Sequence, residues 1–191
     1  MLNEIIAIYA ITDDLLKAIG HKEDSRRVVS DAEIITTAVC AAMFFSGNHS
    51  KACNYMKEHG LIPNMLDKSR FNRRLHGVFM LMNDLFHQMG MILKEISNDT
   101  EYLLDSFPVP MCDSIRIFNV KLIESEQYRG YIASKKRYFY GVRVQLLTTK
   151  TGIPVEFVLF RSMNDSKHVN SFDSQQGFHA VELKRHLPHP Y

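Results

Sequence analysis

The stretch EYLLDSFPVPMC, residues 101–112, marks the point where the sequence changes from helical to strand periodicity. Residues 102–104 are apolar and suit a buried strand, and we expect that strand to end at Asp105. The following apolar segment, with Pro108 and Pro110, is expected to leave the core. A carboxylate at the end of a core strand is either solvated there or held by the strand for a chemical purpose.

The composition is that of an ordinary globular protein. Of the 191 residues, 46% are hydrophobic and 23% are charged. No apolar run approaches the length of a transmembrane helix, and the acids Glu4 and Asp13 are unlike a signal peptide. The three cysteines, Cys40, Cys53 and Cys112, have no paired spacing, so the sequence predicts neither a disulfide framework nor a zinc site. We therefore expect a cytoplasmic protein that has no membrane partner.

Residues 1–98 are expected to be helical, because apolar residues recur near helical spacing. Ser30 and Glu33 form the pattern of a capping box, which predicts a largely buried helix that opens there. Residues 49–60 predict a short helix. After a turn at Pro63, the pattern indicates either one long helix or two consecutive ones.

Beyond the helical region the apolar period becomes that of strands. Alternation over residues 138–147 predicts one strand and residues 153–160 predict a second, joined by a turn at 149–152 into a hairpin. Pro154 should lie at the start or at an edge of its strand. Residues 164–166 predict the cap of a following helix. The fold class is therefore α+β, with a helical region followed by a sheet.

Basic residues are concentrated in two parts of the chain, although the net charge is only +2. Seven basic residues and two acidic ones lie between Arg116 and Arg143. Residues 68–76, KSRFNRRLH, contain no acid at all. A solvated surface explains either cluster alone, but the two together favour a polyanionic partner.

Three arginines of the helical region, Arg70, Arg73 and Arg74, lie near a predicted helix start. Short helices with basic residues at this position are compatible with a helix-turn-helix arrangement that binds DNA. A plain helical bundle with a charged exterior explains the same pattern.

Asp105 is the strongest candidate for a functional group. A carboxylate held at the rim of a sheet suits Mg²⁺, which prefers oxygen ligands and keeps several waters. A pair of such ions supports phosphodiester cleavage by activating the attacking oxygen and stabilising the leaving one. A single carboxylate does not hold a pair of ions, so this chemistry requires further acids.

Several stretches resemble a known family. The segments YLLDSFPVPMCDSIRI (102–117), YRGYIASKKRYFYGVRVQLLTTKTGIPVEFVLF (128–160) and MNDSKHVNSF (163–172) resemble the DDE transposases of bacterial insertion sequences. SDAEIITTAVCAAMFF and NYMKEHGLIPNMLDKSRFNRRLH resemble the helical region before the catalytic core in one branch of that group. The resemblance implies a ribonuclease H-like core, as in retroviral integrases, that uses Mg²⁺. It also implies cleavage of DNA at element ends and strand transfer into target DNA.

The resemblance also implies roles for individual residues. Asp105 matches the first aspartate of the catalytic triad, which is a metal ligand. Asp165 matches a position close to the site, where it either caps a helix or adds a metal ligand. The basic entry to the second core strand implies contacts to DNA phosphates. With the helical cluster, the predicted DNA-binding residues are Arg70, Arg73, Arg74, Lys135, Lys136, Arg137 and Arg143.

The C-terminal part departs from the family pattern. After Phe172 nothing matches the next core strand with its aspartate or the later helix with its glutamate, and we expect Asp173 and Glu182 to be solvated. The predicted regions are a helical, DNA-binding region (1–98), an incomplete ribonuclease H-like core of three strands (99–174) and an off-pattern tail (175–191).

This departure favours a chain shortened by a frameshift or a premature stop. Such a core is expected to be inactive in DNA cleavage. It is also expected to have an open sheet edge and exposed apolar surface around Phe139, Leu147 and Phe157.

Three interpretations therefore remain open. The first is an insertion-sequence transposase by lineage that is inactive as this chain. The second is a non-catalytic DNA-binding fragment that occupies element ends or interferes with a longer transposase, its partner being that chain or a second copy of itself. The third is an unrelated α+β protein whose basic clusters are only solvated surface.

Overall fold

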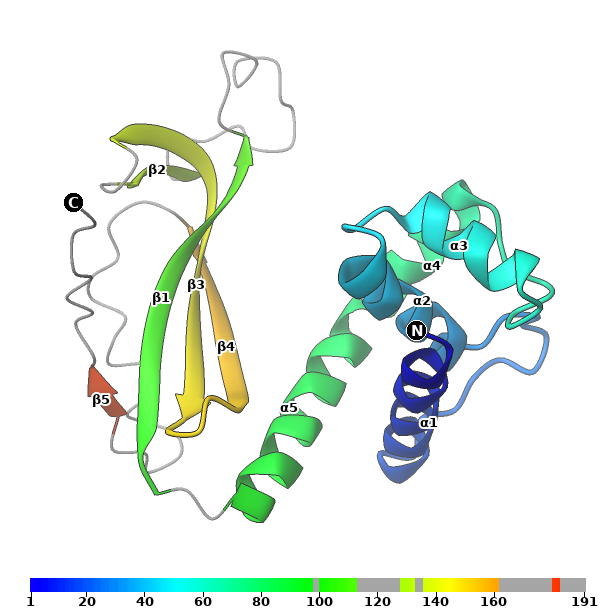
Figure 1. The fold of residues 1–191 in the computed structure, drawn as a ribbon, viewed down its shortest axis with the longest axis horizontal. Coiled ribbons are helices and arrows are strands. Elements are labelled where there is room, and N and C mark those ends of the chain that lie inside the picture. Colours follow the sequence, from blue (N-terminus) through cyan, green and yellow to red (C-terminus); the bar gives the residue numbers. More distant parts are fainter. Residues whose placement is uncertain (98–99, 113–127, 133–135, 162–179, 183–191) are drawn as a thin grey trace. The chain divides into compact units, whose positions relative to one another are not determined.

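The computed structural model describes residues 1–97, 100–112, 128–132, 136–161 and 180–182 (Figure 1). The chain divides into two compact units, residues 1–89 and 90–191. The boundary falls inside the last helix, because the second half of that helix packs with the sheet. The fold is α+β, as the sequence predicts.

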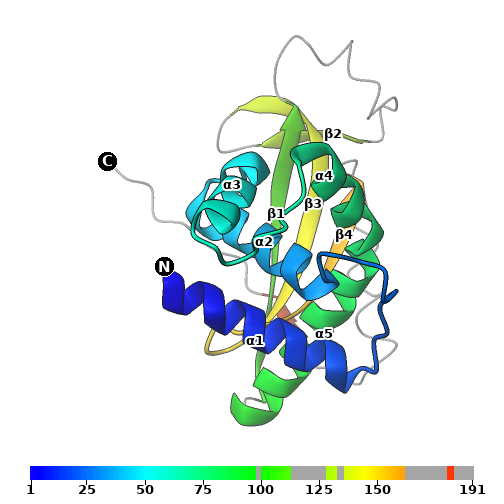
Figure 2. The ribbon, with the colours of Figure 1, turned by 90° about the vertical axis from the view of Figure 1, so that its right-hand side faces the viewer.

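The first unit is helical (Figure 2). The described helices are α1 (Leu2–Ala18), α2 (Asp31–Phe44), α3 (His49–Glu58), α4 (Lys68–Gly77) and α5 (Phe79–Ser97). Their apolar faces meet in one core, whose fully buried side chains include Ile34, Cys40, Met56 and Phe71. Burial raises the pKa of the Cys53 thiol to about 11, so this cysteine is an apolar core residue.

Side-chain caps fix where three of these helices begin. The capping box is confirmed: Glu33 N–H donates to the Ser30 hydroxyl at 3.1 Å, and Ser30 N–H donates to the Glu33 carboxylate at 2.7 Å. Asn48 accepts from the N–H of Lys51 and caps α3. Asp67 caps α4. Each cap satisfies backbone donors that a helix start leaves without a partner, typically worth about 1 kcal/mol.

After Pro63 the chain forms two helices rather than one long helix. The break lies at Val78, whose side chain is 4% exposed and belongs to the helical core. The sequence pattern left both arrangements open, because apolar residues continue at helical spacing across the break.

The second unit contains a mostly antiparallel sheet (Figure 1). Its described strands are β1 (Tyr102–Cys112), β2 (Arg129–Ile132), β3 (Arg137–Thr149), β4 (Pro154–Arg161) and β5 (Ala180–Glu182). One edge of β3 pairs with β1. The other edge pairs first with β2 and then with β4.

The predicted hairpin is confirmed as β3 and β4, and Pro154 is the first residue of β4. The turn between them includes Gly152 at φ +90, a conformation that residues with a Cβ rarely adopt. Thr149 N–H donates to the carbonyl of Ile153 at 2.8 Å and closes this turn.

The prediction that β1 ends at Asp105 is wrong, because the strand continues to Cys112. Pro108 pairs with Arg143 and Pro110 with Gly141. Successive residues of an antiparallel strand direct their N–H groups to opposite edges. Pro108 and Pro110 are two residues apart, so their nitrogens face the same edge. When that edge is the one away from β3, the prolines remove no hydrogen bond to β3. Within the described residues, no strand pairs with that other edge of β1 beyond Leu104.

A short strand, β5, lies in the segment that the sequence pattern left as an off-pattern tail. Strand β5 lies beside the start of β1, and its register pairs Glu182 with Leu104 in the parallel direction. A strand of three residues is shorter than the alternating runs that periodicity detects, which explains why the sequence pattern missed it.

The expected exposure of apolar residues in the sheet is wrong for Phe139 and Leu147, both of which have no exposed surface, whereas Phe157 is half-buried. Leu147 belongs to a buried cluster with Tyr102, Leu104 and Val155. These side chains lie on the face of the sheet that α5 approaches.

Gly90 of α5 sets how closely the helix approaches β4. A Cβ at this position would lie 2.4 Å from the carbonyl oxygen of Val155, far inside a van der Waals contact. Farther along α5, the Lys94 ammonium lies 5.4 Å from the centre of the Tyr102 ring. The glycine therefore permits a helix–sheet contact that any side chain would prevent.

We predict that Gly90→Ala lowers the free energy of unfolding by about 1–3 kcal/mol, because the added methyl forces the helix off β4. The matched control is Gly77→Ala, where a Cβ meets nothing within 4 Å. The control should be neutral or up to about 1 kcal/mol more stable, since alanine is the better helix former. Denaturant titration of both variants measures the difference. If both substitutions raised the free energy of unfolding by the same amount, the close packing of Gly90 against β4 would be contradicted.

Candidate nucleic-acid interface

Asp105 lies within β1 rather than at its end. It pairs with Leu146 of β3, its side chain is half-buried, and its Oδ1 accepts from the backbone N–H of Ser106 at 2.9 Å. Strand alternation gives its face of the sheet an apolar character, with Leu103 and Phe107 as its neighbours on β1.

The described residues around Asp105 do not by themselves form a magnesium site. In the part of the chain that the structure describes, the one group of three metal-ligating side chains is His21, Glu23 and Asp31, which lies in the helical unit. The backbone register pairs Glu182 with Leu104. The predicted ligand Asp165 lies outside the described residues.

The three arginines of α4 have different surroundings. Arg70 is exposed and lies 3.3 Å from the Asp67 carboxylate that caps the same helix. Arg73 is exposed, and no ion pair links it to another residue of the described ranges. Arg74 is half-buried, and its guanidinium lies 2.5 Å from Asp31. Of the three, Arg73 is therefore the most available for an external phosphate.

The basic residues of the sheet are placed by β3. Lys136 is exposed and precedes the strand in a left-handed conformation with φ +47. Arg137 opens β3 opposite Ile132 of β2. Arg143 is exposed and lies opposite Pro108. The predicted contact Lys135 lies outside the described residues.

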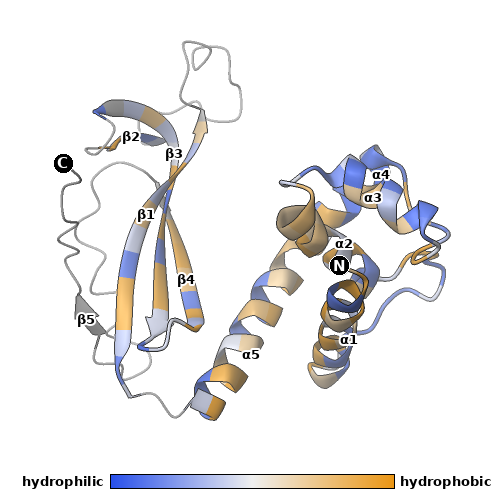
Figure 3. Ribbon diagram, in the orientation of Figure 1, coloured by the Kyte–Doolittle hydropathy of each residue, from blue (hydrophilic) through white to orange (hydrophobic). Residues whose placement is uncertain are grey.

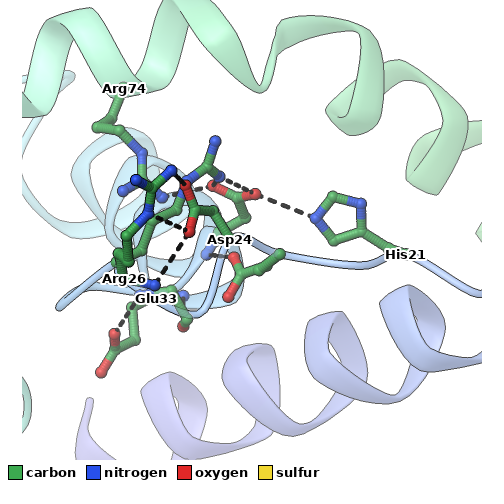
Figure 4. Close-up of polar contacts among 9 residues, drawn as sticks. His21, Asp24, Arg26, Glu33 and Arg74 are labelled. Atoms are coloured by element: carbon green, nitrogen blue, oxygen red, sulfur yellow. Dashed lines mark hydrogen bonds and ion pairs between the residues drawn. The ribbon is translucent and has the colours of Figure 1, made fainter.

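A buried carboxylate, Asp31, accepts hydrogen bonds from several side chains of the helical unit. Figure 4 shows the polar contacts of this region and labels two of its partners, His21 and Arg74. The Asp31 side chain is 3% exposed. Arg27 Nη1 donates to both of its oxygens at 3.0 and 2.8 Å, and Arg74 Nη2 donates to Oδ1 at 2.5 Å. An ionised carboxylate only accepts, so His21 Nε2 donates to Oδ2 at 3.0 Å. The backbone N–H of Asp31 donates to Glu23.

The electrostatics of this cluster follow from its geometry. Burial disfavours ionisation of Asp31, but the hydrogen bonds from Arg74 and His21 outweigh it and hold the pKa of Asp31 below its usual value. For Glu23 the effect of burial dominates and raises the pKa of its carboxyl.

The cluster is better explained as a structural ion network than as a metal centre. His21, Glu23 and Asp31 have potential ligand atoms within 4.8 Å of one another. However, both oxygens of Asp31 already accept from Arg27 or Arg74, and these two cations oppose the approach of another. Asp31 thereby links the start of α2 with the preceding loop and with α4.

Sequence reasoning missed the role of Asp31. The capping box at Ser30 predicts a helix start. Asp31 follows Ser30 directly and resembles an ordinary acidic residue of the first helical turn. Its partner Arg74 is 43 residues away in sequence, so only the packing of α2 with α4 brings the two together.

None of the helices in the described ranges combines the length and hydropathy needed to span a bilayer. No protein-family model, curated protein or solved structure matches this chain.

We predict that Asp31→Ala lowers the free energy of unfolding by about 3 kcal/mol, because it leaves three cationic or hydrogen-bonding partners of a buried carboxylate without their acceptor. The matched control is Asp24→Ala, which removes the exposed ion pair of Asp24 with Arg26. The control should change stability by no more than about 1 kcal/mol. Denaturant titration compares the variants, and similar losses in both would argue against the network.

Denaturant titration at several pH values provides an independent check of the stabilisation by Asp31. Because the pKa of Asp31 is lower in the folded state than its ordinary 3.8, its stabilisation is complete above that value and is lost as pH falls through the folded pKa. Asp31→Asn should therefore flatten the acid limb of the stability curve.

Proposed function

We propose that this chain is a DNA-binding protein of the insertion-sequence transposase type. The observation that carries the proposal is the charge on β2, β3 and the connection between them. Residues 127–155 contain six basic residues and no acid. Within this segment, Lys136 and Arg143 are exposed and belong to no ion pair among the described residues. A surface with unneutralised cations is suited to a polyanion.

The helical unit supports the same proposal. Arg73 is exposed on α4, whereas Arg74 of the same helix is engaged by Asp31. The Arg74 ion pair holds α4 against the start of α2, and this leaves the outer face of α4 to present Arg73. Figure 3 shows mostly hydrophilic colour on α4 and a mixture of hydrophobic and hydrophilic colour along α5. We assign Arg73 a phosphate contact and Arg74 a positioning role for α4.

The strand order supports the ribonuclease H-like part of the proposal. Strands β1, β3 and β4 form an antiparallel meander, and β5 then returns beside β1 in the parallel direction. The resemblance to DDE transposases implies a further core strand after the first three. Asp105 of β1 would then be the first acid of the catalytic triad, and β5 would replace the strand that carries the second.

The proposed activity of this chain is DNA binding, with the element ends and the target as the DNA partners. Strand cleavage would require Mg²⁺ held by Asp105 and by further carboxylates. Those carboxylates are not supplied by the described residues around Asp105.

We predict salt-dependent DNA binding in which the logarithm of the affinity falls linearly with the logarithm of salt concentration, by about 0.9 per phosphate contact on duplex DNA. Arg73→Ala and Lys136→Ala should each weaken binding to all sequences and reduce that slope by about 1. The matched control is Lys150→Ala, because Lys150 is already paired with Glu101 at 3.0 Å. Fluorescence anisotropy at several salt concentrations measures the slopes. Salt-independent binding, or none, would exclude the proposal.

We further expect Asp105→Ala to leave DNA affinity unchanged, and we expect no Mg²⁺-dependent nicking of plasmid DNA by the unmodified chain. The physical reason is that one carboxylate does not hold a pair of metal ions. Gel analysis of supercoiled plasmid measures nicking. Nicking that Asp105→Ala abolishes would instead establish this chain as an active strand-cleaving enzyme.

A further inference from the structure

Two exposed tyrosines face each other across the β2–β3 pair. Tyr131 pairs with Tyr138 in the antiparallel register, their ring centres are 5.0 Å apart, and the rings are inclined at 53°. The guanidinium carbon of Arg129 lies 4.5 Å from the centre of the Tyr138 ring. We refer to Arg129, Tyr131 and Tyr138 as the tyrosine platform.

The platform presents its rings outward. Tyr131 is 48% exposed and Tyr138 is 59% exposed. The next residue of β3, Phe139, has no exposed surface, because successive side chains of a strand point to opposite faces. The core at this point of β3 is therefore formed by Phe139, and the tyrosines do not contribute to it. An aromatic pair left at the surface beside an arginine is a typical feature of binding sites.

We propose that the tyrosine platform stacks the unpaired bases of single-stranded DNA. Every base has a π face, so stacking on a tyrosine ring binds unpaired bases with little sequence preference. Arg129 covers part of the Tyr138 ring through a cation–π contact and adds positive charge beside it.

Charge complementarity selects nucleic acid as the occupant of this surface. Lys136 is exposed two residues before Tyr138, and the segment 127–155 that contains the platform has no acid. A DNA strand has the two chemical features that this surface matches, flat bases for the rings and phosphates for the cations. Arg143 lies on the other alternation of β3, away from the tyrosines, so its phosphate contact is separate from the platform.

The platform is suited to unpaired rather than paired bases. In a duplex both faces of each internal base are covered by its stacked neighbours, and side chains reach only base edges and phosphates. Stacking on Tyr131 or Tyr138 therefore requires a single strand or an opened end. This inference rests on the proposed DNA binding and adds the form of DNA that β2 and β3 recognise.

The test uses the full chain, a labelled oligothymidylate of about 16 nucleotides and a duplex of equal length. This length is the upper end of the site size of a small single-strand-binding domain. Tyr131→Ala should weaken single-strand binding on the order of 5- to 100-fold, as expected for the loss of one stacked base. Tyr131→Phe keeps the ring and should bind as the unmodified chain does. Duplex affinity should be the same in both variants. Tyr9→Ala, at an exposed tyrosine of α1, is the matched control.

A second readout does not depend on any alanine variant. The chain has eight tyrosines and no tryptophan, so tyrosine dominates its ultraviolet emission. The oligothymidylate should quench that emission, and the quenching should be reduced in Tyr131→Phe. If Tyr131→Ala does not fold, Tyr131→Leu, which keeps apolar volume without a ring, replaces it.

The outcomes separate this inference from the proposed function. If neither DNA form binds, the proposed function fails. If both DNA forms bind, and Tyr131→Ala and Tyr131→Phe have the same affinity for the single strand, only the proposed stacking on the platform is overturned. Tighter, Tyr131-dependent binding of oligouridylate would assign the platform to RNA, and Tyr131-dependent binding of polyglutamate would assign it to an acidic protein. Either result would overturn the assignment to DNA.

Discussion

The sheet depends on the pairing of β1 with β3. This ladder runs from Tyr102 opposite Thr149 to Cys112 opposite Tyr140, and β3 offers its other edge to β2 and β4. The two strands approach closely at Gly141, where a Cβ would lie 2.2 Å from the carbonyl oxygen of Val109. A side chain at this position would separate the strands at the irregular end of the ladder. The placement of Asp105, of the platform and of the hairpin follows from this pairing.

The helical unit is organised by a different constraint, the burial of the Asp31 carboxylate. Removing a carboxylate from water is costly, and the cost is offset only when several donors replace its hydration. Arg27, Arg74 and His21 supply those donors from the preceding loop and from α4. This requirement gives the arginines of α4 separate tasks. Arg74 stabilises the packing of α4, while Arg73 is left at the surface for another molecule.

In the proposed interface, charge and aromatic surface occur together on β2 and β3. Strand alternation places Phe139 in the core and Tyr138 outside, so one short segment contributes both to stability and to recognition. Phosphate contacts provide affinity that depends on salt, and stacked rings distinguish unpaired from paired bases. The two contributions are physically separable, since an arginine and a tyrosine act on different parts of a nucleotide.

The sequence by itself determined the local elements. The capping box at Ser30, the alternation over residues 138–147 and the turn before Pro154 each act within a few residues, so pattern alone predicted α2, β3 and β4. Tertiary structure decided whatever depends on distant partners. It extended β1 past Asp105, because β3 pairs with it to Cys112. It also brought Arg74 to Asp31 and Tyr131 to Tyr138, since those contacts require packing or strand register that no local period encodes.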